Sequence, residues 1–172
     1  MTEPPTPPPQ IRLAQGPDLA AIVAIYNQSI PGRAATADTE PVSLASRRAW
    51  FGRHHPQDYP LWVAEAAGEV VAWLGLQPFH SRPAYRATAE VSLYVATPWQ
   101  RQGYGRALLQ GAIAQSPDLG LRTLLAFIFA HNQPSLRLFE QHQFVERGYL
   151  PQVADLDGRE CDLVILARRL QF

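Results

Sequence analysis

One stretch in the middle of the chain constrains the fold more than any other, because it joins a strand, a turn and a helix without interruption. Thr88 to Val95 is rich in β-branched and apolar residues, which predicts a buried strand. A glycine-rich turn follows it, and apolar residues at helical spacing then predict an amphipathic helix from about Gly103 to Gln115. Because such a helix has to cover a sheet with its apolar stripe, the chain predicts an α/β (α+β) domain.

The rest of the chain continues this mixture of strands and helices. Ala66-Ala67-Gly68 separates two apolar runs, which predicts a hairpin, and Ser43 is a residue type that favours a helix start. We therefore expect a mixed, mostly antiparallel central sheet flanked by helices. The further expected strands are Ile11–Leu13, Leu61–Glu65, Glu69–Leu76, Arg122–Ala130 and Asp162–Ala167, and the further expected helices are Leu19–Tyr26, 44–51 and Pro134–Gln141.

Length and proline content predict the domain boundaries. The chain has 172 residues, which is close to the usual size of one domain. Residues 1–9 contain five prolines, which prevent a regular helix, so we expect a proline-rich flexible tail there and a single domain over residues 10–172. The lone Cys161 has no partner for an internal disulfide, and no apolar run has the length of a membrane span, so we expect a cytoplasmic protein without membrane contact.

The charged residues exclude several classes of function. All 15 basic residues are arginine, so Schiff-base chemistry and the lysine-dependent P-loop are excluded. The 15 acidic residues bring the formal net charge to zero and no basic stripe is visible, so no nucleic-acid partner is expected. The five histidines do not pair with cysteine or carboxylates at metal-ligand spacing, so no metal is expected.

The turn after the central strand has the chemistry of an anion site. Residues 100–105 read Gln-x-x-Gly-x-Gly, and Arg101 and Arg106 flank the predicted helix start, whose free N–H groups attract anions. The dinucleotide-binding pattern needs a third glycine where Leu108 stands. The turn therefore predicts a pyrophosphate cradle, with a plain helix start on a flexible turn as the alternative.

At this point the chain resembles the GNAT superfamily of acyl-CoA-dependent N-acyltransferases. The signature of that family matches Gln100 to Gly105, and a second family segment matches Ile128 to Glu140. The resemblance covers about Ile11 to Leu170 and is strongest to the phosphinothricin and methionine sulfoximine N-acetyltransferase group. It implies the GNAT fold, whose sheet is splayed where acyl-CoA binds, and it suggests a homodimer.

The resemblance also implies acetyl-CoA as co-substrate and a set of residues that bind it. The strand backbone before the turn pairs with the pantetheine arm in that family, and the turn itself holds the diphosphate. The implied residues are Leu93, Tyr94, Val95, Gln100, Arg101, Gln102, Gly103, Tyr104, Gly105, Arg106, Asn132 and Ser135. Asn132 has a second interpretation, as a helix N-cap that needs no ligand.

Glu90 is the candidate catalytic residue. It stands in an otherwise apolar strand, where burial raises a carboxyl pKa toward the range of a useful base, and it matches the glutamate regarded as the base in the resembling group. The alternative is a structural carboxylate paired with an arginine such as Arg86. The group usually has His or Tyr where this chain has Phe139, so a general acid, if one is used, has to be another residue; Tyr94, Tyr104 and Tyr149 are the candidates.

An amino-acid-like acceptor needs a cation for its carboxylate, and an arginine fork suits that role. Arg82 and Arg86 lie in the loop before the Glu90 strand, beside Tyr85, and Thr36 is a further candidate for acceptor binding. We therefore expect an acetyl-CoA-dependent N-acetyltransferase that acts directly on the primary amine of a small molecule, such as phosphinothricin or methionine sulfoximine. Two alternatives stay open: a non-catalytic acyl-CoA-binding module and a protein or peptide N-acetyltransferase.

Overall fold

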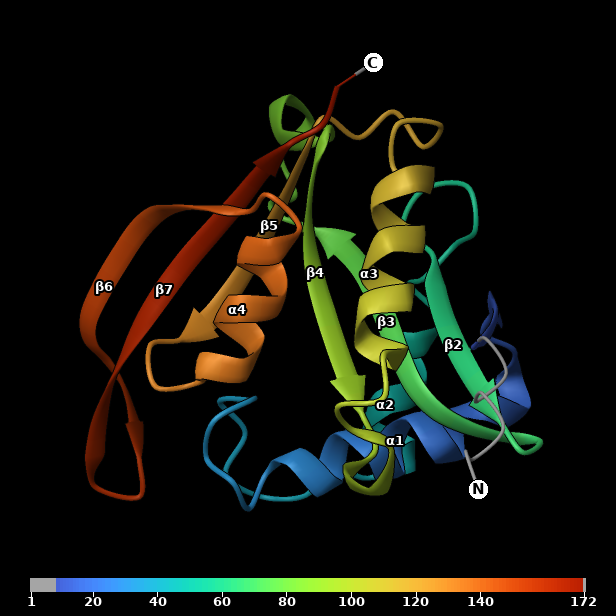
Figure 1. Ribbon diagram of the computed structural model, residues 1–172, viewed down its shortest axis with the longest axis horizontal. Coiled ribbons are helices and arrows are strands. Elements are labelled where there is room, and N and C mark those ends of the chain that lie inside the picture. The colour runs from blue at the N-terminus through green and yellow to red at the C-terminus, as the bar shows by residue number, and fades with distance from the viewer. Residues whose placement is uncertain (1–8, 172) are drawn as a thin grey trace, which may run out of the picture.

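A seven-stranded sheet in the order β1-β2-β3-β4-β5-β7-β6 forms the centre of the computed structural model, which describes residues 9–171 (Figure 1). Neighbouring strands are antiparallel except β4 and β5, which are parallel, so the expected mixed and mostly antiparallel sheet is confirmed. The expected tail lies, apart from Pro9, outside the described residues. The strands are β1 (Gln10–Leu13), β2 (Leu61–Ala66), β3 (Glu69–Pro78), β4 (Thr88–Val95), β5 (Thr123–Phe129), β6 (Val145–Leu156) and β7 (Arg159–Arg169).

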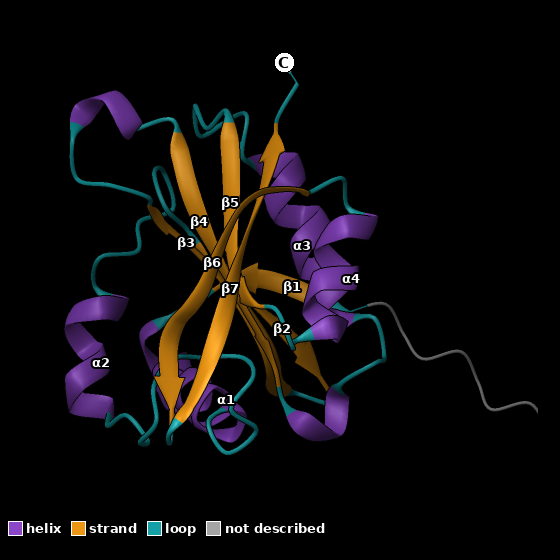
Figure 2. Ribbon diagram, turned by 90° about the vertical axis from the view of Figure 1, so that its left-hand side faces the viewer, coloured by secondary structure: helices purple, strands orange, loops and turns teal. Residues whose placement is uncertain are grey.

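Four α-helices cover the two faces of the sheet. Helices α3 (Tyr104–Gln115) and α4 (Gln133–Gln141) lie on one face, and α1 (Leu19–Ser29) and α2 (Leu44–Phe51) lie on the other (Figure 2). The predicted cap of α2 is confirmed, because the Ser43 side chain accepts a hydrogen bond from the Ser46 N–H. Among the described residues, no helix has the length and apolarity needed to cross a membrane.

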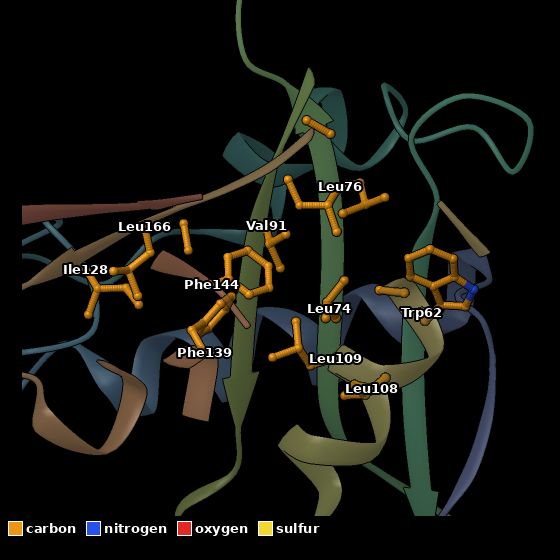
Figure 3. Packing of buried hydrophobic residues seen from close by; sticks show 14 of the residues in the cluster. Trp62, Leu74, Leu76, Val91, Leu108, Leu109, Ile128, Phe139, Phe144 and Leu166 are labelled. Atoms are coloured by element: carbon orange, nitrogen blue, oxygen red, sulfur yellow. The ribbon is translucent and has the colours of Figure 1, made fainter. Parts of the chain in front are cut away.

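Both faces of the sheet are buried, which explains why the central strands are apolar almost throughout. Along β2, Trp62 and Ala64 pack under α3, whereas Leu61 and Val63 pack under α1. The larger cluster gathers Leu74, Leu76, Val91, Leu108, Leu109, Phe139 and Phe144 between the sheet and helices α3 and α4 (Figure 3). Each fully buried leucine there contributes roughly 1.5–3 kcal/mol relative to an exposed one.

The parallel pair β4–β5 is short, and this opens the sheet. The register pairs Thr88 with Thr123, Ala89 with Leu124 and Glu90 with Leu125, and no pair follows. Beyond Glu90 the strands diverge toward the lower end of Figure 1, and α4 lies over the opening. The expected splayed sheet is thereby confirmed, and the point where the strands part, here called the fork, lies at Glu90.

Two strands at one edge of the sheet differ from the expectation. β6 was not predicted, and the last strand runs over Arg159–Arg169 instead of Asp162–Ala167. β6 is an edge strand with mostly exposed side chains, its register shifts twice, and Pro151 interrupts its pattern. Because most side chains of β6 are exposed on both faces, its residues show little of the alternation of apolar and polar positions that identifies a strand.

An ion triad fixes the N-terminal edge of the sheet. The guanidinium of Arg12 donates to Asp18 at 2.7 Å and, through Nε, to Glu65 at 2.8 Å. Asp18 also accepts from the Gln15 N–H, and these hydrogen bonds hold its pKa below the usual value, with the Arg12 bond as the largest cause. Asp18 is buried whereas the Arg12 and Glu65 side chains are 31% and 22% exposed, so the triad joins β1 to α1 and β2 at a partly solvated edge.

Candidate active site

Two adjoining clefts open where the sheet splits. The fork cleft, of about 480 Å³, lies between the diverging strands; its walls include Glu90, Val91, Leu93, Phe127 and Phe129. The turn cleft, of about 750 Å³, continues from it along the end of β4 to the glycine-rich turn and the start of α3. Both clefts share Ala34, Ala35, Leu93, Tyr94, Asn132 and Ser135, so they form one continuous depression.

The backbone of β4 presents polar groups to this depression. Thr88 accepts from the Phe79 N–H, and Ala96 donates to the Val71 carbonyl, so the even-numbered residues of β4 bond to β3. In an antiparallel ladder the peptide groups alternate in direction, so those of Leu93 and Val95 face the opposite side, where β5 has already diverged. This edge of β4 therefore offers hydrogen-bonding groups to a bound chain, as an unpaired strand does.

The glycine-rich turn has a conformation that glycine supports. Gly103, the N-cap of α3, has φ +92°, in the left-handed region where a side chain is strained. A Cβ on Gly105 would contact Leu138 at 3.4 Å and Val95 at 3.6 Å, so the helix start packs closely on β4 and α4. The start of α3 borders the turn cleft, and the free N–H groups at a helix start favour an anion.

Two arginines add positive charge beside this helix start. Arg101 and Arg106 are exposed and line the turn cleft. Gln100 donates to the Val95 carbonyl at 3.2 Å, and Gln102 donates to the Pro98 carbonyl at 3.0 Å, so these glutamines brace the turn. Although the formal net charge of the chain is zero, Arg101 and Arg106 place positive charge at the turn-cleft end of the depression.

Glu90 is half-buried at the fork, where it lines the fork cleft. Burial raises the pKa of its carboxyl group, and a hydrogen bond from Gln77, its cross-strand neighbour, offsets part of that rise. Glu90 makes no ion pair with Arg86, whose side chain is exposed, so the alternative of a structural Glu90–Arg86 pair is wrong. A carboxylate with a raised pKa in a cleft is typical of a general base.

Of the residues predicted to bind the co-substrate, all except Gln102 line the turn cleft. Asn132 has the capping role that the sequence left open, because its side chain accepts from the Ser135 N–H at 3.3 Å. It also donates to the Ala34 carbonyl. These roles occupy its carbonyl oxygen and one amide N–H, although its side chain still borders both clefts.

The residues predicted to bind the acceptor are less closely gathered. Thr36 lines the fork cleft, whereas Arg82, Tyr85 and Arg86 line neither cleft. Tyr85 packs edge-on to Phe79 with ring centres 5.6 Å apart, and Phe79 stacks on Phe127 at 6.5 Å. The loop that carries the arginines thus reaches the wall of the fork cleft through two aromatic contacts.

The three tyrosines differ in their suitability as a general acid. Tyr149 lies on exposed β6, bonds to Asp162 and lines neither cleft. Tyr94 donates its O–H to the Ala35 carbonyl at 3.1 Å, and burial raises its pKa, so its proton is firmly held. Tyr104 is buried against Trp99 and borders the turn cleft. Phe139 is a core residue, as expected, packed edge-on to Phe144.

From the segment between α1 and α2, the sequence pointed only to Thr36 as a site residue and not to its neighbours. Residues 34–37 line the fork cleft, and Ala34 and Ala35 also line the turn cleft. The only local signal is a run of small residues after Pro31-Gly32, which does not reveal what the run packs against. In the part of the chain that the structure describes, no group of three or more His, Cys, Asp or Glu residues could hold a metal ion.

Comparison with known proteins gives concordant matches. The model of the acetyltransferase (GNAT) family matches residues 19–144. A Bacillus subtilis (strain 168) protein named "Putative phosphinothricin acetyltransferase YwnH" is 50% identical over 93% of this chain and 98% of its own length. An L-methionine sulfoximine/L-methionine sulfone acetyltransferase of Pseudomonas aeruginosa is 36% identical over 93% of this chain and 94% of its own. Among solved structures, a GNAT superfamily phosphinothricin acetyltransferase from Sinorhizobium meliloti in complex with AcCoA is 29% identical, with a TM-score of 0.89 over 94% of this chain and 88% of that one.

Proposed function

The chain belongs to the GNAT acetyltransferase family, and from that premise we propose that it transfers the acetyl group of acetyl-CoA to the primary amine of a small molecule such as phosphinothricin or methionine sulfoximine. The observation that carries the proposal is the position of Glu90, in the fork cleft that continues along the open edge of β4 into the turn cleft. A base, a donor channel and an acceptor space are thus adjacent.

The residues of the turn cleft fit acetyl-CoA. The diphosphate suits the start of α3, where free N–H groups and the charges of Arg101 and Arg106 face the cleft. The amide-bearing pantetheine arm suits the outward peptide groups of Leu93 and Val95, which it would bond as an added strand. This chain has no lysine, so arginine supplies the permanent positive charge for phosphate recognition, beside the backbone N–H groups.

Acetyl transfer at this site is a direct displacement. The neutral amine attacks the thioester carbonyl, so a C–N bond forms, while the carboxylate of Glu90 takes the amine proton, directly or through a water. An outward N–H near Val95 stabilises the oxyanion of the tetrahedral intermediate. That intermediate then collapses: the C–S bond breaks and its electron pair leaves on sulfur. Since an ordinary thiol has a pKa of about 8.5, the thiolate leaves without strong acid assistance. This is consistent with Phe139, which cannot donate a proton, in place of His or Tyr.

The acceptor fits in the fork cleft, between Glu90 and the loop that contains Thr36. The arginine-bearing loop ends at Arg86, directly before β4, and therefore lies at the Glu90 end of that strand. Arg82 or Arg86 would bind the acceptor's carboxylate, and the aromatic contacts from Tyr85 to the cleft wall would shape the space beside it. A homodimer and a cytoplasmic location stay predictions from the sequence.

The test is release of free thiol from acetyl-CoA, followed with a thiol reagent, together with mass spectrometry of the acetylated product. Phosphinothricin or methionine sulfoximine should give thiol and product in equal amounts. No thiol across a panel of amino acids and amines would refute the small-molecule acceptor. Tight acetyl-CoA binding without turnover would instead select the binding module, and turnover with peptides alone would select the protein acetyltransferase.

A further inference from the structure

Three consecutive carbonyl oxygens of the loop between α1 and α2 are each held by a different side chain. His131 Nε2 lies 2.7 Å from the Arg33 carbonyl, Asn132 Nδ2 lies 3.1 Å from the Ala34 carbonyl, and the Tyr94 hydroxyl lies 3.1 Å from the Ala35 carbonyl. A carbonyl only accepts, so His131 has to donate with a proton on Nε2. We call these three contacts the carbonyl clamp.

The carbonyl clamp spans the fork. Tyr94 comes from β4 on one side, whereas His131 and Asn132 follow β5 on the other. The His131 ring stacks on Phe129, with ring centres 5.5 Å apart and an interplanar angle of 13°, and Phe129 is a wall of the fork cleft. The stacking on Phe129 therefore sets the plane of the His131 ring and the direction of its Nε2–H, and Phe129 also bounds the fork cleft.

We infer that His131 is a positioning residue for the acceptor, which acts by holding residues 34–37 at a fixed distance from the fork. Ala34 and Ala35 border both clefts, and Thr36 follows them into the fork cleft. A shift of their carbonyls would change the width of the space beside Glu90. The identity of the ligand in that space rests on the proposed function, but the restraint on the loop does not.

Other contacts hold this loop on both sides of the clamped carbonyls, so loosening the carbonyl clamp shifts one part of the loop and does not release the whole. Asn27 bonds to the N–H and the carbonyl of Val42, and Tyr26 bonds to the side chains of Thr36 and Asp38. The Arg33 side chain donates to the Ile30 and Thr39 carbonyls and pairs with Asp157. These contacts join the loop to α1, to itself and to the β6–β7 turn. The clamp is what joins residues 33–35 to the two sides of the fork.

Substituting His131→Ala removes one hydrogen bond and the stacking of its ring on Phe129, and the expected result is a roughly two- to tenfold higher KM for the acceptor. The kcat should stay within about twofold of the wild type, because Glu90 and the outward N–H groups belong to β4 and not to the loop. Amide hydrogen exchange of residues 34–37 should become faster by a similar factor. His131→Gln, which keeps a donor at comparable reach, should restore most of both properties.

The matched control is His142→Ala. His142 also contacts a backbone carbonyl, that of Leu138 at 2.8 Å, and is also half-buried, but it lines neither cleft. The control should lose similar thermal stability without change in acceptor KM or in exchange of residues 34–37. Unchanged exchange in His131→Ala would overturn the inference whether or not an acceptor is known. Faster exchange with an unchanged acceptor KM would overturn the positioning role, and absence of any acetylated acceptor would count against the proposed function alone.

Discussion

Two glycines of α3, one at its N-cap and one in its interior, allow the effect of backbone conformation on stability to be measured separately from side-chain packing. Gly103 has φ +92°, whereas Gly111 lies inside the helix, and a Cβ at either position would meet nothing within 4 Å. A change to alanine therefore alters backbone preference at both sites without a steric clash. Gly103→Ala should lower the free energy of unfolding by about 1–2 kcal/mol, which is the cost of a left-handed conformation for an L-residue. Gly111→Ala should raise it by about 0.5–1 kcal/mol, because alanine stabilises a helix interior relative to glycine.

The assay is equilibrium unfolding in guanidinium chloride, supported by thermal melting. For a chain of this size each kcal/mol corresponds to roughly 2–4 °C, so Gly103→Ala should melt about 2–8 °C below the wild type and Gly111→Ala a few degrees above it. The denaturant m-value should be the same in all three proteins, because neither change alters the surface exposed on unfolding.

Acetyl-CoA provides a second measurement on the same variants. Saturation of a site at about 100 times its Kd stabilises the wild type by about 2.7 kcal/mol. Gly103→Ala should gain less, because the helix start that faces the turn cleft depends on this residue's left-handed conformation, and Gly111→Ala should gain the full amount. Equal stability of the two alanine variants, or an equal gain from acetyl-CoA, would refute the argument that Gly103 is required for its backbone conformation.

Further predictions concern three ionisable groups. Glu90→Gln should lower kcat by about 10²–10⁴-fold without weakening acetyl-CoA binding. Because the base has to be ionised, wild-type kcat/KM should rise with pH through the raised pKa of Glu90. A Gln variant that keeps full activity would exclude Glu90 as the base. The same raised pKa means that ionised Glu90 disfavours the folded state, so the stability of the wild type relative to Glu90→Gln should fall as pH rises through it. Tyr94→Phe should lower kcat by less than about tenfold, measured by thiol release, because its proton is held by the Ala35 carbonyl; a loss of about 10²-fold or more would make it the general acid after all. Asp18→Asn should lower the free energy of unfolding by about 1–3 kcal/mol at neutral pH. Since Arg12 lowers the pKa of Asp18, the difference in stability between wild type and variant should disappear as pH falls through that lowered value. A difference in denaturant unfolding that does not change with pH would contradict the ion triad.

Much of the fold was predictable because its signals are local. The left-handed glycine, the amphipathic stripe of α3, the Ser43 cap and the hairpin turn at Ala67-Gly68 each follow from a few neighbouring residues. β6 was missed because an edge strand with exposed side chains and a proline lacks the period that identifies a strand. The same limit applies to the acceptor residues: Arg82 and Arg86 were predicted from residue type and proximity in sequence, and the structure leaves both outside the cleft walls.

By itself, the sequence determined the chemistry that is available: arginine as the only permanently cationic side chain, a glycine-rich turn suited to an anion, and Glu90 in an apolar strand. Only the tertiary structure decided where these groups meet. The split of the sheet at Glu90 depends on β4 pairing with β5 for three residues, and the carbonyl clamp joins His131 to a residue 98 positions away. The physical reason is that helical and strand periods are set by neighbouring residues, whereas a cleft is set by the points at which distant strands stop pairing, and that depends on the packing of the whole sheet.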